Sequence, residues 1–189
     1  MENYVETYNA ITQSGGWSAA GADTFRLDKL ILELCGYNDT MSVLDYGCGW
    51  GSLLTIIDPP DYHGVDISPT MVRLAREEFP KKVFDLCHPG TLSVPEKDII
   101  IAHSVFTHIP DSIIDDCLSD IKNNLKDSGI AIIDIFIDHV ITDSNLVFRK
   151  ENEWLLLLRH NGLIGKYIAK RNRSEVYTHY YYKVGIEHG

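Results

Sequence analysis

One stretch, Ser42 to Ser52, constrains the fold more than any other part of this chain. A short apolar run ends in Asp45, and Gly47, Gly49 and Gly51 follow. A helical pattern of apolar residues comes next, so the sequence predicts a strand, a tight turn and a helix. Three glycines in five residues remove β-carbons from the turn, which lets a ligand lie against bare backbone. The helix N-terminus adds free N–H groups and a positive dipole end.

The acid before the glycines indicates which ligand this turn suits. Dinucleotide sites follow the pattern G-x-G-x-x-G/A, whereas this chain has G-x-G-x-G and places Ser52 at the third dinucleotide position. A carboxylate at Asp45 would repel a pyrophosphate and would suit a cationic ligand. Asp66 ends the next apolar stretch, and its two oxygens match paired ribose hydroxyls. The alternatives are a plain turn in an unrelated α/β protein and, for Asp66, a helix-start acid beside Ser68.

Two motifs stand in order along the chain, Leu44–Gly51 and Gly64–Ser68. They resemble the first and second motifs of class I S-adenosylmethionine (SAM)-dependent methyltransferases, and the resemblance runs from about Trp17 to the C-terminus. It implies SAM as cofactor and S-adenosylhomocysteine (SAH) as product. The residues that it implies for the cofactor site are Trp17, Arg26, Asp45, Gly47, Gly49, Gly51, Asp66, Ile67, Asp85, Leu86 and His103.

The same resemblance implies a part of SAM for each of these residues. The three glycines and the backbone at the end of the fourth strand meet the methionyl part, and Asp45 helps to place its amino group. Ile67 lies against the adenine, and the pair Asp85-Leu86 meets the adenine edge, although a plain loop is an equal alternative there. Arg26 would reach the cofactor carboxylate with its bidentate fork. A solvated helix face for Arg26 and core packing for Trp17 are the alternatives.

Apolar runs alternate with helical periodicity through the chain, which is typical of a mostly parallel sheet with helices on both faces. We therefore expect an α/β fold, a three-layer α/β/α sandwich. The resemblance implies seven strands in the order 3-2-1-4-5-7-6, ending in a C-terminal antiparallel hairpin. We expect one domain, 1–189, with an N-terminal arm and helix at 1–37 and a Rossmann-like core at 38–189. The expected strands are 41–45, 62–66, 83–86, 98–102, 130–137, 163–170 and 175–184, and the expected helices 23–36, 52–57, 68–79, 111–125 and 151–161.

Charge and composition argue against several partners. The net charge is −10, and no run of basic residues is longer than Lys81-Lys82, so a nucleic-acid partner is not expected. The motifs of nucleic-acid methyltransferases, Asp-Pro-Pro-Tyr after the fourth strand and a Pro-Cys nucleophile, are not found. The four cysteines show no metal-ligand spacing, and neither a signal peptide nor an apolar run of membrane-spanning length occurs. We expect a cytoplasmic protein without membrane contact, and the oligomeric state is not readable.

Histidines at predicted strand ends are candidates for a catalytic base. His103, His108 and His139 follow the fourth and fifth strands, where the acceptor should bind. Methyl transfer needs proximity and, for a protic acceptor, a base, and a histidine suits that task. We favour His108, which precedes Pro110, although a histidine is frequent there in the family without being a base. The remaining histidines, expected to be structural or at the surface, are His63, His160, His179 and His188.

A metal-dependent mechanism is a weaker alternative. Asp134, Asp138, His139 and Asp143 would supply the ligands, but all four lie in or after one strand, and clusters on one strand are usually not sites, so we expect no metal. The predicted function is SAM-dependent methyl transfer to oxygen or nitrogen of a small-molecule acceptor. One alternative is a SAM- or nucleotide-binding module of the same fold without turnover. Another is an NAD-dependent oxidoreductase, against which Asp45 and the Ser52 position count.

Overall fold

The structure is a computed structural model that describes residues 27, 29–137, 146–172 and 178–188. Its strands are β1 (Val43–Tyr46), β2 (Tyr62–Asp66), β3 (Val83–Leu86), β4 (Lys97–Ala102), β5 (Leu125–Ile137), β6 (Phe148–Arg149), β7 (Leu163–Asn172) and β8 (Thr178–Ile186). Its helices are α2 (Lys29–Cys35), the 3-10 helix η2 (Ser52–Thr55), α3 (Pro69–Glu78), α4 (Ile114–Asn123) and α5 (Glu151–His160).

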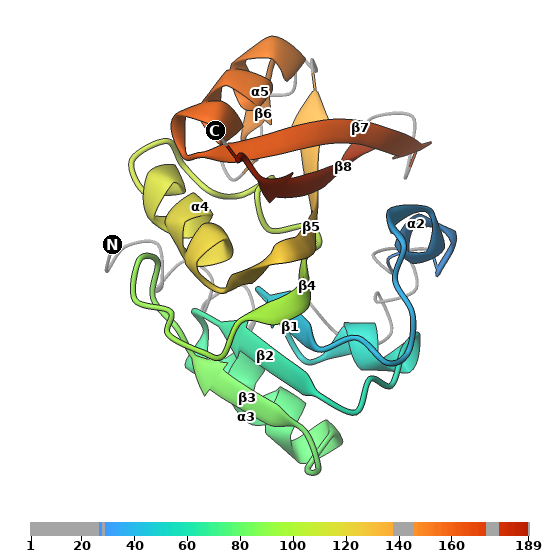
Figure 1. The fold of residues 1–189 in the computed structure, drawn as a ribbon. Helices are drawn as coiled ribbons and strands as arrows, with labels where there is room; N and C mark the ends of the chain where they lie inside the picture. Colours follow the sequence, from blue (N-terminus) through green and yellow to red (C-terminus); the bar gives the residue numbers. More distant parts are fainter. Residues whose placement is uncertain (1–26, 28, 138–145, 173–177, 189) are drawn as a thin grey trace.

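The strands form one twisted sheet (Figure 1). Seven of them follow the order β3-β2-β1-β4-β5-β8-β7, and the short β6 pairs with β5 outside this path. β8 runs antiparallel to β5 and β7, whereas the other pairs are parallel. Because β7 and β8 are the sixth and seventh expected strands, the expected order and the C-terminal hairpin are confirmed. The one addition to the expected sheet is β6.

Several element boundaries differ from the expected ones for local reasons. β5 begins at Leu125, five residues early, because Leu125 pairs with Lys97 before the register of the two strands shifts. η2 is a 3-10 helix rather than an α-helix, and the prolines at 59 and 60 prevent its extension. α4 begins at Ile114, after a turn in which Ile113 N–H donates to Pro110 O. α2 ends at Cys35, and the next residue, Gly36, has a φ of 90°, as expected for a glycine that follows a helix.

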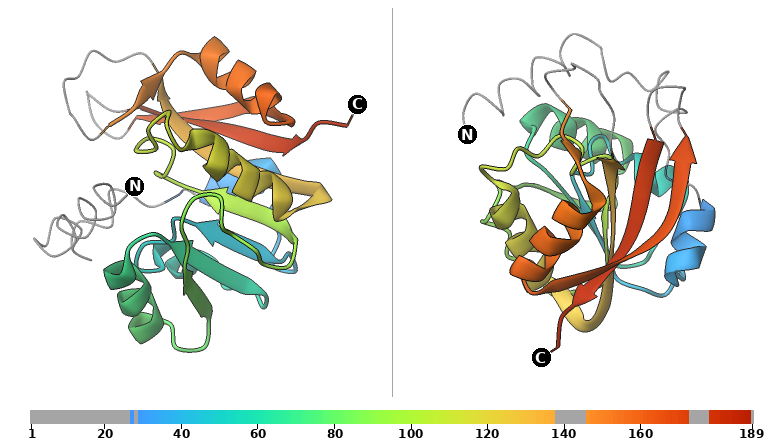
Figure 2. Two further views of the ribbon diagram at one scale, coloured as in Figure 1. Left: turned by 90° about the vertical axis from the view of Figure 1, so that its left-hand side faces the viewer. Right: turned by 90° about the horizontal axis from the view of Figure 1, so that it is seen from above.

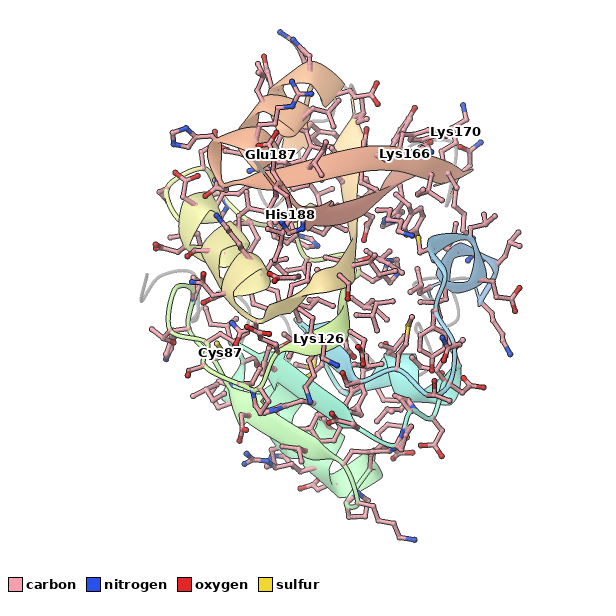
Figure 3. All side chains as sticks on the ribbon, in the orientation of Figure 1. Cys87, Lys126, Lys166, Lys170, Glu187 and His188 are labelled. Atoms are coloured by element: carbon pink, nitrogen blue, oxygen red, sulfur yellow. The ribbon has the colours of Figure 1, made fainter. Side chains whose placement is uncertain are left out.

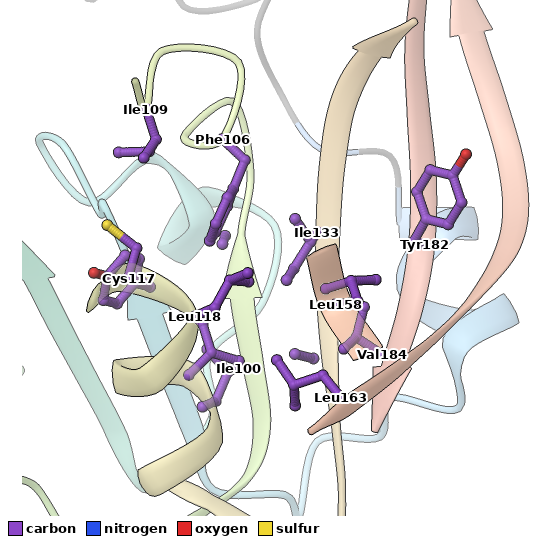
Figure 4. Close-up of a cluster of buried hydrophobic side chains, with 14 of the residues drawn as sticks. Ile100, Phe106, Ile109, Cys117, Leu118, Ile133, Leu158, Leu163, Tyr182 and Val184 are labelled. Atoms are coloured by element: carbon purple, nitrogen blue, oxygen red, sulfur yellow. The ribbon is translucent and has the colours of Figure 1, made fainter. Parts of the chain in front are cut away.

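Helices cover both faces of the sheet, as the right-hand view of Figure 2 shows for α4 and α5 on one side and α2 on the other. One buried cluster joins β1, β4 and β5 to α4 and α5, with Ile100, Leu118 and Trp154 at its centre; part of it appears in Figure 4. The second cluster joins the opposite face to α2 and α3 through residues such as Leu32 and Val72. The expected three-layer α/β/α architecture is therefore confirmed. No helix within the described ranges has the length and apolar character to cross a bilayer.

The amino-terminal edge of the strands is held by Asp98. Its Oδ2 accepts hydrogen bonds from Ser42 N–H at 2.9 Å and from Ser42 Oγ at 2.7 Å, and Lys126 Nζ lies 2.7 Å from Oδ1 (Figure 3 labels Lys126). These bonds, the one from Lys126 first, lower the pKa of Asp98 to about 2. This network ties the start of β4 to β1 and β5. It lies at the edge opposite to the carboxyl ends of the parallel strands, where ligands bind in such sheets.

Candidate active site

The glycine turn after β1 leaves open space at its centre. Gly47, Gly49 and Gly51 have φ values of 76°, 54° and 86°, in the left-handed region that favours glycine. A β-carbon on Gly47 would overlap the side chain of Val105, and one on Gly51 would come within 3.0 Å of the Phe79 ring. A β-carbon on Gly49 would meet no atom of the described residues within 4 Å. Packing therefore explains two of the glycines, and the third faces space that a ligand can enter.

Asp66, the last residue of β2, clamps this turn. Gly49 N–H donates to its Oδ2 and Ser68 N–H to its Oδ1, both at 2.8 Å. Burial raises the pKa of Asp66, and the bonds from Ser68 and Gly49 partly oppose that effect. Each carboxylate oxygen has a second lone pair, so the clamp leaves acceptor capacity for the hydroxyls of a sugar. The Ser68 hydroxyl also accepts from Met71 N–H and caps α3, with Pro69 at the first helical position, as the sequence predicts.

Asp45 lies beneath the glycine turn and is 5% exposed. Its Oδ2 accepts a hydrogen bond from the Tyr62 hydroxyl at 2.7 Å. Burial raises the pKa of Asp45 to about 7; the Tyr62 bond and the nearby His103 oppose this rise, while Asp66 adds to it. A cation placed beside a carboxyl group lowers its pKa, and a group with a pKa near 7 then ionises at neutral pH. Asp45 is therefore suited to an ammonium or sulfonium group.

The end of β4 lies beside this turn and carries a cluster of polar side chains. His103 Nδ1 is 3.1 Å from Oδ1 of Asp134 in β5, and His179 Nδ1 in β8 is 2.5 Å from Oδ2. Ser104 N–H donates to Oδ1 at 2.7 Å, and Ser104 has a φ of 59°. This φ is uncommon for a residue other than glycine. Asp134 thus holds both the imidazole of His103 and the unusual turn that follows it.

Strand alternation explains why these groups meet. Successive side chains of a strand point to opposite faces, and Ile101 and Ile132 belong to the cluster on the α2 side. His103 and Asp134, two residues further along their strands, therefore lie on that side as well. Tyr181 is on the same face, and its ring stacks on His103 and His179 at centroid distances of 5.8 and 6.1 Å. The Asp134 side chain is completely buried.

The buried carboxylate of Asp134 is paired with two histidines. Burial alone would raise the pKa of Asp134, but His103 and His179 outweigh burial and hold this pKa well below its usual range. The three side chains could also hold a metal ion, since their ligand atoms lie within 4.8 Å of one another. However, each Nδ1 already lies within hydrogen-bonding distance of a carboxylate oxygen, and Ser104 N–H uses the same carboxylate. A hydrogen-bonded cluster describes this arrangement better than an ion site.

The loop after β4 is fixed by Arg149 of β6. Its guanidinium donates to Phe106 O at 3.1 Å and to Ile109 O at 2.7 Å, and it lies 2.9 Å from Oδ1 of Asp111. His108 is part of this loop, and its N–H donates to Val105 O at 2.9 Å. Arg149 is 7% exposed and was not identified from the sequence, because residues 138–149 lack a periodic pattern. The loop that carries both described histidine candidates is therefore held from a distant part of the chain.

Comparison with known proteins agrees with this geometry. The profile of the methyltransferase domain family matches residues 44–131, which include the glycine turn, Asp66 and His103. This match supports the class I SAM-dependent methyltransferase family, which the two sequence motifs resemble. A relative from Mycobacterium tuberculosis, Rv1506c, which is provisionally named a methyltransferase, is 47% identical over 45 residues. That match covers 22% of this chain and 27% of the relative, so the chain matches about a quarter of that protein's length.

Solved structures share the fold at low sequence identity. The YcgJ protein from Bacillus subtilis has a TM-score of 0.72 and 16% identity, covering 85% of this chain and 98% of that chain. A second example is the 1,6-didemethyltoxoflavin-N1-methyltransferase of Burkholderia thailandensis, solved with 1,6-didemethyltoxoflavin and SAH. It has a TM-score of 0.70 and 18% identity, covering 100% of this chain and 87% of that chain. These likenesses confirm the methyltransferase fold.

Some of the remaining residues that the family resemblance implies are described in the structure, and others lie outside the described residues. The Asp85 carboxylate is engaged by His63 Nε2 at 2.9 Å and by Arg76 Nη2 at 3.2 Å. Leu86 is 48% exposed and lines a groove of about 390 Å³ beside α3, so both members of the pair reach the surface. Ile67 is half-buried between Asp66 and the α3 cap. Trp17, Arg26 and His139, and with them Asp138 and Asp143, lie outside the described residues.

Besides Arg149, His179 is a residue that the sequence reasoning did not place near the site. We expected a structural or surface histidine because it has no partner at motif spacing; it is buried, at 1% exposure, and it shares Asp134 with His103. Its partner lies 45 residues earlier in the chain, so no motif spacing links the two. The contact depends on the register of β5 and β8, in which Phe136, two residues beyond Asp134, pairs with His179; the sequence alone does not show this register.

Proposed function

We propose that this protein transfers the methyl group of SAM to an oxygen or nitrogen atom of a small-molecule acceptor. The observation that carries the proposal is the contact between the glycine turn after β1 and the segment after β4 that begins with His103. Val105, just after His103, packs against Gly47 of the open glycine turn. This contact supports a site in which a histidine that has a carboxylate partner lies close to the bound cofactor. Proximity of acceptor, methyl donor and base is the main requirement of this reaction.

The described residues fit SAM by their chemistry. Gly49 supplies open backbone for the methionyl part, Asp66 accepts from the ribose hydroxyls, and Asp45 faces the cationic end. Bound SAM supplies a methyl group that is already activated by its sulfonium. The acceptor's oxygen or nitrogen forms the new bond to the methyl carbon, and the electrons of the broken C–S bond remain on sulfur, giving SAH. His103 then has to take the proton that the acceptor loses.

We favour His103 over His108 as the base. Both lie after β4, but His103 has the buried carboxylate of Asp134 at its Nδ1. An imidazole that donates from Nδ1 keeps Nε2 free of a proton, as a base requires. His108 is anchored in its loop through a backbone hydrogen bond to Val105. The residue preferred from the sequence and the residue preferred from the geometry are therefore different, and variants of both are needed.

A small molecule is the acceptor class that the charge supports best. The net charge of −10 disfavours a polyanion such as a nucleic acid. The Burkholderia thailandensis neighbour is, by its name, an N-methyltransferase of a small heterocyclic compound, which supports the same class here. The described cysteines are Cys35, Cys48, Cys87 and Cys117, and all are free thiols, which agrees with a reducing compartment such as the cytoplasm.

Titration calorimetry and a turnover assay test this proposal. The protein should bind SAM and SAH and should not bind NAD, because Asp45 disfavours a pyrophosphate. SAH should form when SAM is supplied with a panel of phenols, amines and nitrogen heterocycles. Binding of SAM without SAH formation on any acceptor would favour a binding module of the same fold. Binding of NAD in place of SAM would contradict the proposal.

A further inference from the structure

The Asp134 carboxylate contacts two histidines and a backbone N–H, which is more than it needs to hold His103 alone. Its side chain is completely buried between β4 and β8. Oδ1 faces both Ser104 N–H and His103 Nδ1, and Oδ2 faces His179 Nδ1. A buried carboxylate is costly unless its oxygens are paired, and here both are. His179 itself is buried and lies away from the glycine turn in sequence and strand order, so its contribution acts through Asp134.

We propose that His179, Asp134 and His103 form a hydrogen-bonded relay in which Asp134 and His179 position His103 as the base for methyl transfer. This inference rests on the proposed function. Asp134 and His179 are positioning residues, because neither needs to touch the acceptor. Together they fix which nitrogen of His103 carries its proton in the resting protein and where the other nitrogen points.

The relay orients His103 for the transfer of one proton from the acceptor to Nε2, and that proton does not pass through Asp134 or His179. In the resting protein, Nδ1–H of His103 donates to Oδ1 of Asp134, and Nε2 carries a lone pair with the Ser104 hydroxyl 3.5 Å away. The acceptor's O–H or N–H bond breaks as its methyl bond forms, and the proton is bound by Nε2. His103 is then an imidazolium whose charge is balanced by the carboxylate 3.1 Å away. Stabilisation of such an imidazolium by a buried aspartate is an established effect of paired histidine and aspartate residues.

His179 prevents Asp134 from turning away from His103. Without its Nδ1–H, Oδ2 would be a buried acceptor with one partner fewer, and the carboxylate would gain by rotating toward other donors. The Tyr181 ring stacks on both imidazoles, with interplanar angles of 19° and 21°. That stacking restricts the planes of the two rings, so their Nδ1 atoms converge on the same carboxylate.

The first test measures tautomers, and it does not depend on finding an acceptor. In nitrogen-15 NMR spectra of the free protein, His103 and His179 should both carry their proton on Nδ1. Asp134→Asn should change the tautomer or broaden both signals. His179→Leu should change that of His103, whereas His179→Asn, whose amide can replace Nδ1–H, should preserve it. Asp98→Asn is the matched control, since it alters a paired carboxylate at the opposite edge of the sheet.

The second test is kinetic and uses any acceptor that turns over. Asp134→Asn should lower kcat by about 10²–10⁴-fold, and His179→Leu by about 10-fold, with partial recovery in His179→Asn. KM for SAM should change by less than about twofold in each case.

Several results would overturn the relay. An Nε2-protonated His103 in the wild-type spectra would do so whether or not the protein is a methyltransferase. So would equal losses of kcat in Asp134→Asn and Asp98→Asn, because general destabilisation would then explain both. Loss of wild-type activity in a chelator, restored by zinc or manganese, would replace the relay with a metal site on the same three residues. Failure to bind SAM, with the tautomers as expected, would reject the proposed function instead.

Discussion

Gly49 donates its backbone N–H to Oδ2 of Asp66 at 2.8 Å. This bond joins the centre of the glycine turn to the acid at the end of β2, so the two sequence motifs form one structural unit. The same carboxylate also holds Ser68 N–H at the start of α3. Asp66 therefore shapes the glycine turn, and in the proposed function it also offers oxygens to SAM, so its replacement should affect binding in two ways.

Asp66→Ala should weaken SAM binding by at least about 1.5–3 kcal/mol, the range for loss of hydrogen bonds to a charged group. The released Gly49 N–H adds to the loss, so Asp66→Asn, which keeps one acceptor oxygen, should weaken binding less. Titration calorimetry on samples with native circular dichroism measures both effects. An unchanged affinity in a folded Asp66→Ala protein would remove Asp66 from the cofactor site.

Gly49→Val should abolish SAM binding while the fold persists. The new side chain would enter the open space before the turn, and the φ of 54° would cost on the order of 1–3 kcal/mol. Gly36→Val is the matched control, because Gly36 is also left-handed and a β-carbon there meets only the end of Lys183, at 3.9 Å. Its stability should fall similarly with SAM binding intact. Equal SAM affinity in the two variants would show that the turn does not cradle the ligand.

Asp45 should make both stability and SAM affinity depend on pH. Its pKa in the folded protein, about 7, lies above the ordinary value of 3.8. Between these values the folded state therefore binds more protons than the unfolded state, and the free energy of unfolding falls as pH rises from about 4 to about 7. Asp45→Asn should remove the part of this pH dependence that Asp45 causes. Compared with the wild type, its free energy of unfolding should therefore be relatively higher at pH 8 than at pH 5, as urea unfolding can measure.

The affinity for SAM should change in the opposite direction. A cationic ligand favours the ionised Asp45, so wild-type affinity should rise with pH up to about 7 and binding should release protons below that pH. Asp45→Asn should bind more weakly and lose this pH dependence. Calorimetry in buffers of different ionisation enthalpy counts the released protons. Proton release that is unchanged in Asp45→Asn would exclude Asp45 as its source.

His103→Ala and His108→Ala should separate the two candidate bases. His103→Ala should lower turnover by about 10²–10⁴-fold, the usual contribution of a general base, with little change in SAM affinity. The loss should become smaller at high pH, where a protic acceptor ionises without help. His108→Ala should be much milder. The reverse order of the two losses would return the role to His108, and two small losses would mean that proximity alone drives the reaction.

Arg149→Met should disturb the loop after β4. It removes the donors to Phe106 O and Ile109 O, and an unpaired buried carbonyl costs about 1–3 kcal/mol. We expect a lower urea midpoint together with a lower kcat, because the loop that carries His108 and follows His103 loses its anchor. Normal kcat in the destabilised variant would show that this anchor serves the fold alone.

Local signals determined a large part of this molecule. The glycine pattern, the acid at the end of β2 and the Ser68-Pro69 start of α3 are encoded within a few consecutive residues, because turns and helix caps are formed by neighbours in sequence. The alternation of apolar runs with helical segments was sufficient to predict the three layers. The family resemblance was sufficient to predict the order of the seven strands.

Only the tertiary structure decided which polar groups meet. His103, Asp134 and His179 stand on three strands, and their contact depends on the registers of β4, β5 and β8, which no local pattern encodes. Arg149 likewise reaches a loop about 40 residues earlier. A shift of one residue in any of these strands would turn its side chains to the other face. The buried cluster around Asp134 is therefore a property of strand pairing, whereas the glycine turn is a property of the sequence itself.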